Sequence, residues 1–122
     1  EAIGNQVKQL GLKLIAITSL KHATSPVARA QGRKIHELAD ITIDNLGQVG
    51  DATIAYPGLE EKTGPTSTVL GTAIVNALVV RSVEIMIENG YKPEIFSSSN
   101  TLDGDSRNSE LLSILKERVS IL

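Results

Sequence analysis

The chain has 122 residues, of which 41% are hydrophobic and 2% aromatic, and its formal net charge is -2. This length allows one domain at most, with enough apolar residues for a packed core. The small negative charge and the lack of a basic run give no basic surface for nucleic acid. The lack of cysteine excludes disulfides, thiolate zinc sites and cysteine nucleophiles, and it is consistent with the reducing cytoplasm, where we expect the protein.

The first two predicted elements are a helix and a strand. Apolar residues spaced by four and three predict a helix over residues 1–10, and Gly11 is the predicted stop. The apolar run Leu12–Thr18 is typical of a buried strand. Because no Met and no capping residue precede the helix, we expect the chain to begin inside an element of a longer domain.

A second strand follows a predicted crossover helix. Ser25 and Pro26 are residue types favoured at the cap and the first position of a helix, so we expect a helix of about a dozen residues to begin there. Residues 39–44 are typical of a short strand, which pairs in parallel with the first through a right-handed crossover. Two strands alone leave both faces and both edges uncovered. We therefore expect further strands, either ahead of Glu1 in the intact protein, which we favour, or from another chain.

The remaining chain is dominated by one long apolar segment. Residues 45–65 are predicted to form a loop with four glycines and two prolines, long enough to be a functional candidate. Thr66–Glu88 is predicted to be a helix that is buried on more than one side, against a sheet and a second subunit. Asn76, Arg81 and Glu84 interrupt its apolar run, which argues against a membrane span.

The C-terminal part is predicted to be irregular over residues 91–104 and then helical. Asp105 or Ser106 is the predicted cap of this last helix. Its apolar stripe comprises Leu111, Leu115, Val119 and Leu122.

Polar residues follow each of the two predicted strands, at the edge where open α/β sheets bind ligands. Thr18 and Ser19 end the first strand, with ordinary turn chemistry as the alternative interpretation. His22, three residues on, is suited to proton transfer or to contact with a substrate hydroxyl, with a solvated loop histidine as the alternative. Asp51 follows the second strand and either contacts a ligand or holds its own loop through backbone hydrogen bonds. His36 is predicted to be a surface residue.

Three hydroxyl residues, Thr66, Ser67 and Thr68, stand at the predicted start of the long helix. Unpaired N–H groups and the helix dipole favour a negative group there. The alternative is that these residues only cap the helix, although three hydroxyls exceed what a cap needs. Because parallel strands bring their following loops to one edge, we expect the segments of Ser19, Asp51 and Thr66–Thr68 to line one cleft, with the hydroxyls of Ser19, Thr66 and Ser67 near the ligand. Two distant histidines and scattered carboxylates offer no metal-ligand spacing, so no metal site is predicted.

The segment KLIAITSLKHATSPVARAQGRKIHELADITIDN resembles the second half of a sugar isomerase (SIS) domain. Three later motifs, VGDA (49–52), GPTST (64–68) and SSSNTLDG (97–104), are similar to those of an uncharacterised phosphosugar-binding subfamily of SIS-domain proteins near the sugar-phosphate etherase branch. The resemblance covers nearly all of the chain.

The resemblance implies a three-layer α/β sandwich around a five-stranded parallel sheet, of the flavodoxin- or Rossmann-like kind. The chain would hold the last two strands with their flanking helices, so that residues 1–122 form the C-terminal part of a single SIS domain. The family's glycine-rich turn and its serine-rich phosphate loop would precede Glu1. Contact with a phosphorylated sugar or amino sugar would then fall to Ser19, His22, Asp51, Thr66, Ser67 and Thr68.

The implied activity is that of a sugar-phosphate isomerase or an etherase-type lyase. Both reactions use a general base to remove a proton next to a carbonyl, and neither needs a redox cofactor, so we expect none. The catalytic Glu or His would lie ahead of Glu1 or on a partner subunit, or be His22, the one candidate in this chain whose unperturbed side chain titrates near neutrality. One alternative is a non-catalytic sugar-phosphate sensor or regulatory module, and another is a half-domain scaffold that only dimerises through its long helix. We expect a homodimer, with no nucleic acid bound through this chain and no membrane.

Overall fold

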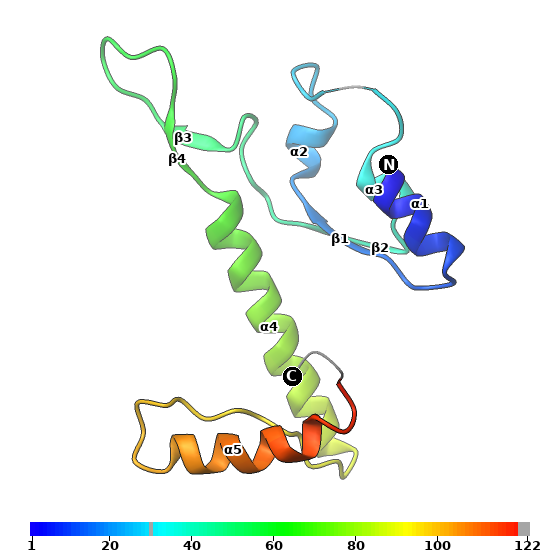
Figure 1. Ribbon diagram of the computed structural model, residues 1–122. Coiled ribbons are helices and arrows are strands. Elements are labelled where there is room, and N and C mark those ends of the chain that lie inside the picture. Colours follow the sequence, from blue (N-terminus) through cyan, green and yellow to red (C-terminus); the bar gives the residue numbers. More distant parts are fainter. Residues whose placement is uncertain (30, 120–122) are drawn as a thin grey trace. The chain divides into compact units, whose positions relative to one another are not determined.

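A computed structural model of the chain describes residues 1–29 and 31–119 and has a mixed α/β composition (Figure 1). The residues form two compact units, Glu1–Val79 and Val80–Leu122. The elements follow in the order α1 (Ala2–Gln9), β1 (Ile15–Thr18), α2 (Leu20–Ala23), α3 (Ile35–Leu38), β2 (Ile41–Asp44), β3 (Ala52–Ile54), β4 (Thr63–Pro65), α4 (Ser67–Glu88) and α5 (Gly104–Leu115).

The first helix confirms its prediction in both position and ending. α1 stops where Gly11 enters the left-handed region with φ of 69°. The N–H of Gly11 donates to the carbonyl of Lys8 at 3.0 Å, and the N–H of Leu12 donates to that of Val7 at 3.2 Å. This pair of bonds is the Schellman motif, which satisfies carbonyls that the helix end leaves free.

The two predicted strands pair in parallel, as expected. β1 and β2 are in register from Ile15 opposite Ile41 to Thr18 opposite Asp44. Asp40 sits just ahead of β2, and its Oδ2 accepts the N–H of Leu14 at 2.9 Å. Both strands therefore begin at one fixed level, and their carboxyl ends lie together at the other.

The single crossover helix predicted from Ser25 is wrong. Two one-turn helices, α2 and α3, replace it among the described residues. α2 begins earlier than predicted because Ser19 caps it, its Oγ accepting the N–H of His22 at 3.1 Å. Gly32 has φ of 76°, a left-handed conformation that a continuous right-handed helix does not contain.

The core of the unit Glu1–Val79 is small. Ala16 of β1, Ala28 of the crossover and Leu38 of α3 are its buried hydrophobic residues among those described. Leu38 packs against Gly4 of α1. A Cβ added to Gly4 would lie 2.9 Å from the Cδ1 atom of Leu38. Val27, next to the buried Ala28, has an exposed side chain.

The predicted loop at residues 45–65 contains a hairpin instead. β3 and β4 pair in antiparallel fashion, Ala52 opposite Pro65 and Ile54 opposite Thr63. Each strand has three residues, so the glycines and prolines around them dominate the sequence pattern. The hairpin carries the chain from the end of the parallel pair to the start of α4.

The long helix confirms its prediction to within one residue, since α4 covers Ser67–Glu88. None of its 22 residues is buried in the single chain, so the predicted burial against a sheet is not found, and the predicted burial against a second subunit stays a prediction. Strands of four residues span about 13 Å and a helix of this length about 33 Å, so the chain's own strands are too short to cover it. By length and composition alone α4 could also cross a membrane, a test that core helices of soluble proteins pass too. Asn76, Arg81 and Glu84 therefore do not exclude a span on these grounds.

The C-terminal unit consists of the end of α4, an irregular segment and α5. The predicted cap at Asp105 or Ser106 is wrong, since α5 begins at Gly104. The reason is a tight loop, in which a Cβ on Gly104 would lie 2.1 Å from the carbonyl oxygen of Ser98. Leu111 is the buried hydrophobic residue of α5, as its stripe predicts, and Leu122 lies outside the described residues.

Candidate functional site

A pocket of about 230 Å³ lies at the carboxyl ends of β1 and β2, within the unit Glu1–Val79. Its polar lining comes from four places in the chain: the end of β1, the one-turn helix α2, the loop after β2 and the first turn of α4. The side chains that matter most are those of Ser19, His22, Asn45, Asp51 and Ser67.

Ser19 joins the loops that follow the two strands. Its hydroxyl donates to the carbonyl oxygen of Gly47 at 2.7 Å and accepts the N–H of His22 at 3.1 Å. Gly47 is buried, and a Cβ there would lie 3.4 Å from the Cβ of Ser19. One hydroxyl thus caps α2 and holds the neighbouring loop against it.

His22 is held by the same loop. Its Nδ1 accepts the backbone N–H of Gly50 at 3.1 Å. A nitrogen that accepts carries no proton, so this contact selects the neutral imidazole with its proton on Nε2. Nε2 has no hydrogen-bond partner among the described residues, and in this tautomer it is a donor. The geometry therefore suits His22 to hydrogen-bond a ligand hydroxyl or carbonyl better than to act as a general base.

Asp44, the last residue of β2, organises the backbone beside the pocket. Its Oδ1 accepts the N–H of Leu20 at 3.1 Å and the N–H of Leu46 at 3.0 Å. Leu46 has φ of 57°, a left-handed conformation that is costly for a branched side chain and that Asp44 helps to maintain.

Asp51 occupies the start of α4. Its Oδ1 accepts the backbone N–H groups of Thr66 at 2.9 Å and Ser67 at 2.7 Å, and its Oδ2 accepts the hydroxyl of Ser67 at 2.8 Å. The hydroxyl of Thr66 also donates to Oδ1 at 3.2 Å. The hydroxyl bond from Ser67 is the largest of several hydrogen bonds that lower the pKa of Asp51 from its ordinary value, against a smaller opposing effect of desolvation. The anion at this helix N-terminus is therefore the protein's own carboxylate.

The structure brings four of the six predicted substrate contacts to the pocket: Ser19, His22, Asp51 and Ser67. The backbone N–H of Thr66 donates to Asp51, but Thr66 is not part of the lining. Thr68 is exposed and lies outside the lining.

Sequence reasoning missed the loop directly after β2. Asn45, Gly47 and Gln48 all line the pocket. Asn45 had an available signal, since it follows the carboxyl end of a parallel strand as Ser19 does. Gln48 accepts a hydrogen bond from Lys21 at 2.9 Å, a contact that no local pattern indicates.

Most residues of the pocket lining have polar side chains, and one of them is a carboxylate. Among the described residues of the lining Asp51 is the one carboxylate, and the others offer hydroxyl, amide, imidazole and backbone groups. Within residues 1–29 and 31–119, no three His, Cys, Asp or Glu side chains gather closely enough to hold a metal ion. Such a lining suits hydrogen bonding to a hydroxyl-rich molecule.

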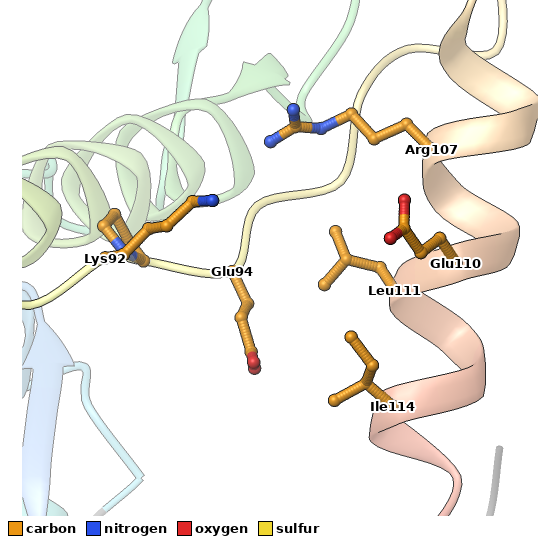
Figure 2. Close-up of a pocket in the computed structure, with 7 residues that line it drawn as sticks. Lys92, Glu94, Arg107, Glu110, Leu111 and Ile114 are labelled. Atoms are coloured by element: carbon orange, nitrogen blue, oxygen red, sulfur yellow. The ribbon is translucent and has the colours of Figure 1, made fainter.

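A larger cavity of about 360 Å³ lies in the C-terminal unit (Figure 2). Arg107, Glu110, Leu111 and Ile114 come from α5, and Lys92 and Glu94 come from the segment ahead of it. None of the predicted site residues lines it. We place the candidate site at the smaller pocket because that pocket lies where parallel strands end.

Comparison with known proteins gives bacterial relatives of greater length. The chain is 40% identical over 116 residues to a UPF0309 protein of Geobacillus kaustophilus, an alignment that covers 94% of the chain and 46% of the relative. It is 38% identical over 120 residues to a UPF0309 protein of Thermoanaerobacter pseudethanolicus, and this alignment covers 96% of the chain and 49% of the relative. No family model matches the chain. The chain thus spans about half the length of the curated relatives it matches, and their names state no activity.

Proposed function

We propose that the chain is the C-terminal part of a cytoplasmic SIS-domain protein that binds a phosphorylated sugar or amino sugar. The observation that carries this proposal is that the polar side chains of Ser19, His22, Asp51 and Ser67 line one pocket at the carboxyl ends of two parallel strands. Open α/β sheets bind their ligands at this edge.

The proposal includes the sheet of the whole protein. β1 and β2 would be the last two strands of a five-stranded parallel sheet in a three-layer α/β sandwich. Ile15 and Ile41, which begin the two strands, are both exposed, as expected of strands that await cover on their faces. The relatives are about twice as long as the chain, which leaves room in them for further strands.

The groups around the pocket match the needs of a sugar. A pyranose or open-chain sugar presents several hydroxyls, each both donor and acceptor. Nε2 of His22 and the side-chain amide of Asn45 supply donors. Oδ2 of Asp51 accepts one hydrogen bond from the protein, so it retains acceptor capacity toward a ligand.

Whether the bound sugar is turned over depends on a general base. The hydrogen bond from Gly50 to Nδ1 of His22 disfavours that role for His22, because it leaves the proton on Nε2. A base for an isomerase or etherase-type lyase would then be a residue other than His22. The same observation favours the second candidate function, a non-catalytic sugar-phosphate sensor or regulatory module.

The test is calorimetry on the full-length protein with a panel of sugar phosphates, comparing wild type with Ser67→Ala and Thr68→Ala. Ser67 lines the pocket and its neighbour Thr68 does not, so the two variants form a matched pair. Loss of one hydrogen bond to an uncharged sugar hydroxyl weakens binding by roughly 0.5–1.5 kcal/mol, which is about two- to tenfold. We expect that loss for Ser67→Ala and an unchanged affinity for Thr68→Ala. Absence of binding by every sugar phosphate would refute the proposal.

The same samples separate the two candidate functions. Following the bound sugar phosphate by NMR over hours reports any isomer or elimination product. Product formation at a rate proportional to protein concentration identifies an enzyme. Tight binding with the sugar unchanged identifies a sensor or regulatory module.

A further inference from the structure

The start of α4 carries every donor that an anion site needs. Two backbone N–H groups and two hydroxyls, from Thr66 and Ser67, converge there. A phosphate at a helix N-terminus is held by such groups. In this protein all four donate to the carboxylate of Asp51.

Asp51 reaches this position from outside the helix. It is separated from Thr66 by the β3–β4 hairpin and has φ of 68°, a left-handed conformation that Asp tolerates better than most residues. Its carboxylate places a full negative charge where a ligand anion would sit. A second anion would have to displace that carboxylate or lie against it, and like charges at close range repel.

The rest of the described pocket lining offers no positive charge to offset that of Asp51. No Lys or Arg belongs to its lining, and the nearby Lys21 donates to Gln48. Ser19, His22 and Asn45 supply neutral groups. The pocket beside Asp51 is thus built for hydrogen bonds to uncharged groups.

We propose that Asp51 is a specificity-determining residue, which fills the anion site at the start of α4 and reserves the adjoining pocket for the uncharged, hydroxyl-bearing end of a ligand. This inference rests on the function proposed above, in which the ligand is a sugar phosphate. The sugar ring then enters this pocket and the phosphate stays outside it. Removal of the carboxylate would convert the start of α4 into a phosphate site.

The experiment titrates inorganic phosphate into the full-length protein and follows the backbone amides of Thr66 and Ser67 by NMR. Asp51→Gly is the main variant, because glycine adopts positive φ without strain and brings no carboxylate. Asp51→Asn is the second, since its amide oxygen keeps a bond to the helix N–H groups while the charge is lost. Asp40→Asn removes the same charge at the other end of β2 and is the matched control.

We expect phosphate to shift both amides in Asp51→Gly with an affinity at least about tenfold higher than in wild type, the scale of one charge-assisted hydrogen bond. Asp51→Asn should gain in the same direction, and Asp40→Asn should not gain. Equal phosphate affinity at these amides in wild type and both Asp51 variants would overturn the proposal.

A parallel titration with glucose 6-phosphate keeps the two proposals apart. Shifts at Ser19 and His22 in wild type, with inorganic phosphate producing none there, support entry of the sugar end. If no sugar phosphate shifts these amides, the proposed function fails. The titration of Asp51→Gly with inorganic phosphate still tests separately whether Asp51 excludes anions from the start of α4. If inorganic phosphate alone shifts Ser19 and His22 in wild type, the pocket accepts anions and the inference is wrong.

Discussion

Asp51 and Ser67 are joined through both oxygens of one carboxylate. Oδ1 accepts the backbone N–H of Ser67 at 2.7 Å, and Oδ2 accepts its hydroxyl at 2.8 Å. The two residues are 16 positions apart, so the contact ties the loop after β2 to the first turn of α4. It satisfies N–H groups that a helix start otherwise leaves to water.

The first prediction concerns acid stability. Hydrogen bonds from the N–H of Leu14 and from Lys8 hold the pKa of Asp40 at about 2, below its ordinary value of 3.8, and the pKa of Asp51 is lowered as well. A carboxylate with a lowered folded-state pKa stabilises the fold above the unfolded-state pKa. That stability is lost as the pH falls toward the folded-state pKa. We expect the urea midpoint to fall between about pH 4 and pH 2, and to fall less steeply in Asp40→Asn. An equally steep fall in that variant would show that Asp40 does not contribute to the loss of stability in acid.

The second prediction concerns the exposed face of α4. Val79 and Val80 are 55% and 68% exposed in the single chain, on a helix with no buried residue. Exposed apolar surface of this extent marks an interaction site, which we propose to be the homodimer interface. Val79→Asp should shift the full-length protein from dimer to monomer in sedimentation velocity. Glu84→Gln alters the polar stripe of the same helix, where Arg81 pairs with Glu84 at 2.6 Å, and should leave the dimer intact. A wild type that is already monomeric would reject the interface.

The third prediction compares two glycines. A Cβ at Gly104 would lie 2.1 Å from the backbone oxygen of Ser98, so Gly104→Ala forces the 98–104 loop apart. Overpacking of this kind costs roughly 1–3 kcal/mol. Gly71 in α4 has open space around it, and Gly71→Ala should stabilise the helix by about 0.5–1 kcal/mol. Chemical denaturation of both variants measures the difference, and two changes of the same sign would contradict the geometry.

The fourth prediction concerns the hydroxyl that joins the two strand-end loops. Ser19→Ala removes the bond to the carbonyl of Gly47 and the cap of α2. Loss of a capping side chain costs about 0.5–2 kcal/mol, so the protein should be destabilised by at least that range. Thr24→Ala is the control, because the Thr24 hydroxyl bonds only to Leu20 within α2. Faster amide exchange at Gly50 and His22 in Ser19→Ala alone would show that the loop has loosened.

The elements with strong periodicity were predictable from sequence. β1 and α4 lie in apolar runs, and β2 alternates isoleucine with polar residues; the predicted and observed positions of all three agree to within a few residues. The crossover failed because its outcome depends on Ser19 capping α2 early and on the left-handed conformation of Gly32. Both are local choices that compete with the helix signal at Ser25 and Pro26.

The sequence predicts which segments meet at the candidate site but not the hydrogen bonds that join them. Ser19 and Asp51 follow strands, and Ser67 starts a helix, so the rule for parallel sheets brings them together. That Asp51 fills the helix N-terminus depends on closure of a hairpin whose strands have three residues each. The bond from Gly50 to Nδ1 of His22 spans 28 positions and has no local signature.

The bond between Asp51 and Thr66 also bears on the order in which the chain folds. The 14 residues between them are the β3–β4 hairpin and its flanks, so the carboxylate reaches the helix only once the hairpin has closed. A two-stranded hairpin is marginal on its own, and the first turn of a helix is the part that frays most readily. Each therefore supports the other, and the hairpin with the first turn of α4 should open and close as one cooperative folding unit. Hydrogen exchange should give the amides of Ile54, Thr66 and Ser67 a common opening free energy, distinct from that of the middle of α4.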